Sequence, residues 1–227
     1  ASHYGAVYPY PNTNTQAGAD DWAHYVFVRG GLDTTKGFED STASNPSTNM
    51  PSGWTRNPSS GSNTNRWSYG QISGTAGPTD EPSFPYSMAI NLAGTYGGSL
   101  NANLYSPTFS LPANSTASFV MDHWACFENN WDGAGIFIKV NGGSWNYWDP
   151  GNNFYDTPSI AYTYTSIPQG SNYFGSVHCT GLGSSYTVST TDFESKEASL
   201  ASYAGDNVQF RFHGGSDSIW NYAGWYL

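Results

Sequence analysis

Alternation between apolar and polar residues is the most regular pattern in this sequence. Segment 207–215, NVQFRFHGG, contains an apolar set and an interleaved polar set: Val208, Phe210 and Phe212; Gln209, Arg211 and His213. Successive side chains of a β-strand point to opposite faces, so the pattern predicts a strand with the apolar set in the core. The polar set is expected to face outward, with His213 near the strand end.

Segment 135–145, GIFIKVNGGSW, shows the same period of two and ends in a turn signal. Ile136, Ile138 and Val140 share one face, and Asn141-Gly142 is a typical hairpin dipeptide. Three further segments have strand character: 24–30, 86–94 and 117–128. The chain is therefore expected to be all-β.

Long loops are expected between these strands. Residues 41–85 are rich in Ser, Asn, Pro and Gly, with Trp54, Trp67 and Tyr69 as the aromatic residues that would pin the loops to a core. Only the segment 192–205 invites a helical interpretation, of one or two turns. No sharp linker divides the chain, so a single sandwich domain is expected over residues 21–227.

Residues 1–20 have the composition of an extended N-terminal arm, with two prolines, several turn formers and no sustained period. Such an arm either lies along its own domain or adds a strand to a neighbouring subunit. We expect the second arrangement, which predicts a homo-oligomer.

The charge balance limits the partners. The formal net charge is −10, with 7 Lys and Arg against 17 Asp and Glu. A chain without a basic stripe is not expected to bind nucleic acid or anionic membrane surfaces. No apolar run reaches the roughly 18 residues that span a bilayer, so membrane insertion is not expected either. The excess of carboxylates instead suits a hard cation such as calcium.

The two cysteines and the first residues of the sequence favour an extracellular location. Cys126 and Cys179 fit no zinc or redox motif, and a disulfide between them is expected, with two separate buried thiols as the alternative. Asn114 begins a sequon for N-glycosylation. The Ala-Ser start is typical of a mature protein after cleavage of a signal peptide. The predicted location is therefore secreted, extracellular or cell-surface.

A series of short motifs resembles a known family. In chain order they are GFED (37–40), GW (53–54), PYSMA (85–89), NLYSPTFSLP (103–112), FENNWDGAGIFIKVNGGSW (127–145), YAGDNVQFRF (203–212), SD (216–217) and GWYL (224–227). The series is similar to MAM-type modules, and above all to the module at the C-terminal side of immune-inhibitor-A-type metallopeptidases. The resemblance implies a two-sheet antiparallel jelly-roll sandwich that serves adhesion or recognition.

The resemblance also implies a bound cation near two acidic motifs. Carried over residue by residue, the predicted metal ligands are Glu39, Asp40, Glu128 and Asp132. Calcium binds six to eight oxygen atoms from carboxylates, carbonyls and waters, which such loops supply. The alternative is an acidic loop whose carboxylates only cap local backbone N–H groups.

Aromatic residues near the acidic loop are the candidate contact surface. Trp131, Trp145, Tyr147 and Trp148 could stack on sugar rings or anchor a subunit contact, or they could fold over the domain's own core.

The sequence shows neither HExxH nor GxSxG, and paired carboxylates of a glycosidase need a cleft that no pattern here supplies. We therefore expect no catalytic residues and no enzyme. The predicted function is a non-catalytic, calcium-stabilised subunit of an extracellular surface or filament assembly. A carbohydrate-recognition module is the alternative, followed by a glycan hydrolase or lyase.

Overall fold

The structure is a computed structural model of the chain. It describes the backbone of residues 27–29 and then residues 50–74, 76–79, 86–113, 116–161, 166–181, 185–189 and 192–227. The arm predicted for residues 1–20, the predicted ligands Glu39 and Asp40, and the sequon at Asn114 lie outside these described residues.

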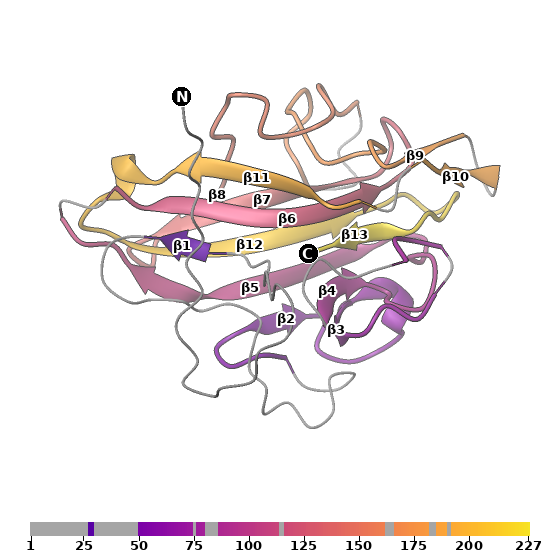
Figure 1. Cartoon of the computed structure of the whole chain (residues 1–227), viewed down its shortest axis with the longest axis horizontal. Helices are drawn as coiled ribbons and strands as arrows, with labels where there is room; N and C mark the ends of the chain where they lie inside the picture. The colour runs from indigo at the N-terminus through magenta and orange to yellow at the C-terminus, as the bar shows by residue number, and fades with distance from the viewer. Residues whose placement is uncertain are drawn as a thin grey trace, which may run out of the picture.

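Two antiparallel sheets pack face to face (Figure 1). The first has the order β1 (Phe27–Arg29), β6 (Ser118–Cys126), β13 (Gly224–Tyr226), β4 (Ser87–Ile90), β3 (Trp67–Gly70), with β11 (Glu194–Ser199) also paired to β6. The second has the order β2 (Thr55–Asn57), β5 (Asn101–Ser110), β12 (Asn207–Gly215), β7 (Gly133–Val140), β8 (Trp145–Tyr147). The predicted all-β sandwich is confirmed.

Smaller elements complete the described part of the chain. They are a two-stranded ribbon of β9 (Cys179–Thr180) and β10 (Thr187–Val188) and the 3₁₀ turns η1 (Asn63–Asn65) and η4 (Ala201–Tyr203). A helical turn or two was expected over residues 192–205. Six of these residues instead form strand β11, and the three residues of η4 form a single 3₁₀ turn. The region expected as loops contains β2 and β3, and its residues Trp54, Trp67 and Tyr69 are buried as predicted.

Large aromatic side chains from both sheets meet in the core. The ring centroid of Phe119 on β6 lies 4.8 Å from that of Phe210 and 6.2 Å from that of Phe212, both on β12. Trp225 on β13 lies 5.8 Å from Phe212. Each such side chain contributes roughly 1.5–3 kcal/mol when it leaves water. The period-two pattern of β12 thus directs its apolar face between the sheets, as predicted.

His213 is not exposed to solvent, contrary to what its predicted outward position would suggest. Its side chain is on the predicted face of β12, but it is buried there, with Nδ1 3.0 Å from the side-chain oxygen of Asn103. The outer face of this sheet is itself covered, since the ring of Phe137 lies 6.0 Å from the imidazole. The alternating pattern predicted the face of β12 on which His213 lies. It could not predict the burial of His213, because the side chain that covers it comes from the neighbouring strand β7.

A disulfide joins Cys126 at the end of β6 to Cys179 on β9, across 53 positions of sequence. The predicted bridge is confirmed, and it indicates an oxidising, extracellular location. Across the part of the chain that the structure describes, no helix has the length and apolarity needed to cross a membrane.

Candidate metal centre

Three carboxylates converge at one end of the sandwich: Glu128, Asp132 and Asp217. Glu128 and Asp132 lie on the connection from β6 to β7, which passes from one sheet to the other. Asp217 follows β12, the strand that pairs with β7 so that Gly215 faces Gly133. This register brings the residue before β7 next to the residues after β12, although they are far apart in sequence.

Asp132 is the fixed member of the group. Its side chain is fully buried, and its two oxygens accept hydrogen bonds from the hydroxyl of Tyr96 at 2.6 Å and from the backbone N–H of Asp217 at 2.8 Å. Burial raises the pKa of the Asp132 carboxyl to about 7, more than these two hydrogen bonds lower it. The charges of Asp217 and Glu128 raise that pKa further. The ionised form of this fixed carboxyl is therefore destabilised by its surroundings.

Glu128 brings an unsatisfied oxygen to the site. Its side chain is partly buried, and Oε2 is shielded from water without a hydrogen-bond partner among the described residues. Burial raises the pKa of the Glu128 carboxyl, and the negative charge of Asp217 raises it further. Buried polar atoms in folded proteins nearly always have a partner, so this oxygen points to a ligand.

The spacing of the three carboxylates fits one cation. One oxygen from each lies within 4.8 Å of the other two. Oxygens on opposite sides of a calcium ion with bonds of about 2.4 Å are about 4.8 Å apart, so these separations lie within the range found among the ligands of one ion. A donor set made only of oxygen suits calcium. The capping alternative accounts for Asp132, which accepts the N–H of Asp217, and for Asp217, which accepts the N–H of Ile219 at 2.8 Å, but it leaves Glu128 unexplained.

The loop between Glu128 and Asp132 is held by backbone contacts. The N–H groups of Trp131 and Asp132 both donate to the carbonyl of Glu128, at 3.3 and 3.0 Å. Asn130 has a positive φ of 69° and donates its N–H to the hydroxyl of Tyr173 at 3.0 Å. That hydroxyl donates to the side-chain oxygen of Asn129 at 3.2 Å, so the amide is engaged within the loop.

The structure brings together two of the four predicted ligands, Glu128 and Asp132. Two residues of the site were not predicted from the sequence: Asp217, a further candidate ligand, and Tyr96, the hydrogen-bond donor to Asp132. Asp217 had a weak signal, because it lies in one of the family-like motifs directly after the most regular strand. Tyr96 lies in an irregular connection between β4 and β5, where no periodic pattern marks it.

The four aromatic residues predicted as a contact surface differ in exposure. Trp148 is in the core against Phe119 and Phe210, and its role as a surface residue is wrong. Tyr147 is partly buried and donates its hydroxyl to the carbonyl of Asn172. Trp145 is partly buried beneath the ammonium of Lys139, which lies 4.4 Å from the ring centroid, and Trp131 is also partly buried.

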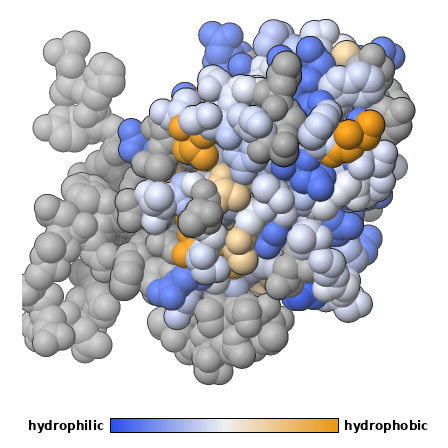
Figure 2. Space-filling view, turned by 90° about the vertical axis from the view of Figure 1, so that its right-hand side faces the viewer, coloured by the Kyte–Doolittle hydropathy of each residue, from blue (hydrophilic) through white to orange (hydrophobic). Residues whose placement is uncertain are grey.

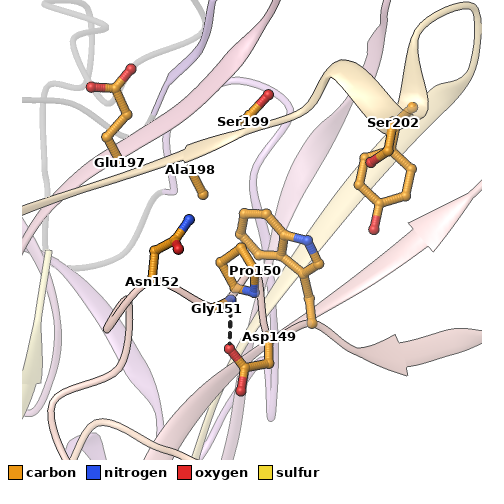
Figure 3. A pocket seen from close by; sticks show the side chains of 10 residues that line it. Asp149, Pro150, Gly151, Asn152, Glu197, Ala198, Ser199 and Ser202 are labelled. Carbon is orange, nitrogen blue, oxygen red and sulfur yellow. Dashed lines mark hydrogen bonds between the residues drawn. The ribbon is translucent and has the colours of Figure 1, made fainter.

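A polar pocket of about 270 Å³ lies between the loop after β8 and strand β11 (Figure 3). Asn152 and Pro150 line it from the loop, and Ala198 and Ser199 line it from the strand. The Asp149 carboxylate accepts hydrogen bonds from the N–H of Gly151 at 2.9 Å (Figure 3) and from the side-chain amide of Asn172 at 3.1 Å. Trp148 lines the pocket but is buried, so this pocket has no exposed indole face on which a sugar could stack.

Exposed apolar residues are concentrated elsewhere. Ile219 and Trp220, which are 60% and 46% exposed, follow Asp217 and line a pocket of about 380 Å³ with Thr95, Tyr186 and Asn221. Figure 2 shows the end of the molecule that carries β9 and β10, where the described surface is mostly hydrophilic and its hydrophobic spots are small and separate.

No family model matches the chain. The chain is similar to Bacillopeptidase F of Bacillus subtilis (strain 168), with 26% identity over 177 residues. The matched stretch covers 78% of this chain and 10% of that protein, so the chain spans about a tenth of the length of this curated relative. The expected MAM-type membership is not confirmed by these comparisons, whereas the β-sandwich is confirmed by the fold.

Proposed function

We propose that this chain is a non-catalytic β-sandwich module of a secreted protein, stabilised by one calcium ion and serving an extracellular surface or adhesive assembly. The observation that carries the proposal is the buried Asp132 carboxylate, fixed by Tyr96 and facing Glu128 and Asp217. Three carboxylates at this distance repel one another, and a divalent cation removes that repulsion.

No cationic side chain supplies this neutralisation within the described residues. The ion pairs described there involve Lys196 and His123, which belong to another cluster. The oxygen of Glu128 without a partner then acquires one when the ion binds. A structural role also fits the position of the site, because the ion would tie the connection between the sheets to the end of β12.

The burial of the site supports a non-catalytic role. Asp132 has no contact with solvent, so a substrate could reach it only after the surrounding loops opened. Acid–base catalysis needs a group within hydrogen-bond reach of the substrate, and the rigid contacts of Asp132 oppose that. The match to Bacillopeptidase F covers a small part of that protein and is compatible with a module that accompanies a catalytic domain elsewhere.

Calcium titration tests the proposal. We expect chelation to lower the melting temperature of the purified chain, calcium to restore it, and calorimetry to show one calcium bound per chain. Asp217→Asn should weaken calcium binding at least tenfold, while Glu197→Gln, an exposed position on β11, should bind like the wild type. Equal melting temperatures with calcium and with chelator would remove the proposal.

Assembly through residues 1–20 is part of the proposal, and these residues lie outside the described part of the chain. Size measurement of the protein with and without them, in calcium and at high concentration, tests this part. Monomers in both preparations would rule out assembly through the arm and would leave the calcium site unaffected.

Carbohydrate recognition is the second candidate, favoured by the exposed ring of Trp220 at a pocket beside the cation site. The neighbouring Asn221 and Thr95 supply the polar groups that sugar hydroxyls need. A glycan array would show binding that Trp220→Ala removes and Trp131→Ala leaves intact. If no polysaccharide binds to the wild type, this candidate function is wrong.

A further inference from the structure

A second cluster of ligating side chains lies away from the carboxylate site. His123 on β6 faces Glu194 directly across the β6–β11 pair, two strands that lie side by side in Figure 1. Asp156 reaches the same point from the loop after β8, where Thr157 pairs with Tyr173 and so fixes the loop. Three separate elements therefore bring one imidazole and two carboxylates together.

His123 has the features of a metal ligand. Its side chain is fully buried, and neither ring nitrogen has a hydrogen-bond partner among the described residues. The ring is held in place by Phe174, whose centroid lies 4.4 Å away. Burial lowers the pKa of His123 well below its usual range, and the nearby His178 and Lys196 lower it further. Because they are buried without a hydrogen-bond partner in the described part of the chain, the ring nitrogens are candidate donor atoms for a metal ion.

The distances suit a small tetrahedral ion. Nε2 of His123 lies 3.3 Å from Oδ2 of Asp156 and 3.8 Å from Oε2 of Glu194. Two ligands of a tetrahedral zinc ion with bonds of about 2.0–2.1 Å are about 3.3 Å apart. The nitrogen donor and the 3.3 Å spacing of His123 and Asp156 match zinc, whereas calcium prefers a larger cage made only of oxygens. Glu194 would have to move slightly closer to complete the tetrahedron.

We propose that His123, Asp156 and Glu194 form a second cation site that binds a divalent transition metal of the zinc class, with water as the fourth ligand. Glu194 is the open side of the site, since its side chain is 49% exposed while those of the other two are 0% and 3% exposed. The ion reaches the buried nitrogen past this carboxylate. The site differs from the calcium site in its donor set.

The side chain of Lys196 contacts both carboxylates of this cluster. Its ammonium contacts Oδ1 of Asp156 and lies 3.1 Å from Oε2 of Glu194. A metal ion must therefore compete with a positive charge that already neutralises both carboxylates. Lys196 thus lowers the affinity of the site for a metal ion and pairs with both carboxylates.

A structural interpretation competes with this proposal. Within the described residues β11 pairs only with β6, and inward charges on such an edge strand prevent pairing with other chains. Under that interpretation the cluster serves only to keep charged ion pairs of Lys196 on the edge strand, and it binds no metal. The two interpretations give opposite results in a zinc titration.

Calorimetric titration of the full chain with Zn²⁺ in saturating calcium separates them. We expect one zinc bound per chain, Glu194→Gln to weaken binding at least tenfold, and Lys196→Met to strengthen it at least tenfold. Glu197→Gln, on the same strand and exposed, is the matched control and should bind like the wild type. Cobalt titration should give the absorption bands of a tetrahedral site in the wild type and lose them in Glu194→Gln.

Several results would overturn the proposal. They are no zinc bound to the wild type, equal zinc affinity of Glu194→Gln and the wild type, or zinc binding that disappears in saturating calcium. The last result would assign the zinc to the calcium site. Because calcium binding is measured separately, failure here leaves the proposed function standing, and loss of calcium binding leaves this proposal standing.

Discussion

The hydroxyl of Tyr96 donates a hydrogen bond of 2.6 Å to the buried carboxylate of Asp132, 36 positions further along the chain. The same hydroxyl accepts the backbone N–H of Glu128 at 3.3 Å. One phenol from the connection between β4 and β5 therefore orients two residues of the candidate calcium site. Residues outside the direct ligand set commonly fix ligands in this way.

Replacing Tyr96 by Phe tests this relationship. The variant leaves the Asp132 oxygen and the Glu128 N–H without their partner inside the protein, which should cost about 1–3 kcal/mol of unfolding free energy. Calcium affinity should fall as well, because Asp132 loses its orientation. Urea denaturation and calcium calorimetry measure the two effects.

Tyr86→Phe is the matched control, since it removes the same atom from a ring packed 5.4 Å from Tyr69. Its effect on calcium affinity should be negligible. If both variants bind calcium like the wild type, Tyr96 does not support the site.

Stability of the chelated protein should fall as the pH rises from about 4 to about 7. The pKa of Asp132 is raised from 3.8 to about 7 by burial, with Glu128 and Asp217 as the charged groups facing it and Tyr96 as the opposing hydrogen-bond donor. The unfolded chain loses its proton near pH 4 while the folded chain keeps it, so the folded state is penalised between these values. The loss is on the order of a few kcal/mol.

Calcium should reverse this dependence, because the ion binds the deprotonated carboxylate. Calcium affinity should therefore weaken as the pH is lowered through about 7, the pKa of Asp132. Denaturation curves at pH 5 and pH 7, with chelator and with calcium, measure both slopes. Identical slopes in the two conditions would contradict the involvement of Asp132.

Gly133→Ala should damage the calcium site without altering a ligand. A Cβ at this position would overlap with the ring of Tyr173, whose hydroxyl accepts the N–H of Asn130 in the ligand loop. The ring must move, and the loop between Glu128 and Asp132 moves with it. We expect lower calcium affinity and a loss of about 1–3 kcal/mol of stability from overpacking.

Gly94→Ala serves as the comparison, since its Cβ would meet only the Asn91 side chain at an ordinary 3.6 Å. This variant should bind calcium like the wild type. Unchanged calcium affinity in Gly133→Ala would show that the contact with Tyr173 does not position the loop.

The double variant Cys126→Ala/Cys179→Ala should be less stable than the wild type by roughly 4 kcal/mol. Closing a loop of 53 positions removes about this much conformational entropy from the unfolded chain. Denaturant midpoints of the variant and of the wild type, with and without reductant, measure the effect. Reductant should lower the midpoint of the wild type only; equal midpoints for both proteins without reductant would contradict a stabilising role.

Local pattern in the sequence was sufficient for the class of fold. The alternation over Val208, Phe210 and Phe212 predicted β12 and its buried face, because the two faces of a strand are set by the backbone itself. The Asn141-Gly142 turn between β7 and β8 follows equally local rules. With two cysteines in the chain, each has only one possible partner, but the structure was needed to decide between a disulfide and two separate thiols.

Only the tertiary structure decided which polar residues meet. Asp217 donates its N–H to Asp132 across 85 positions, and His123, Asp156 and Glu194 come together from three elements. No periodic pattern records such contacts, because they depend on strand register and on how the sheets are connected. The sequence thus determined an all-β fold with excess carboxylates, and packing between distant segments determined where some of those carboxylates face a common point.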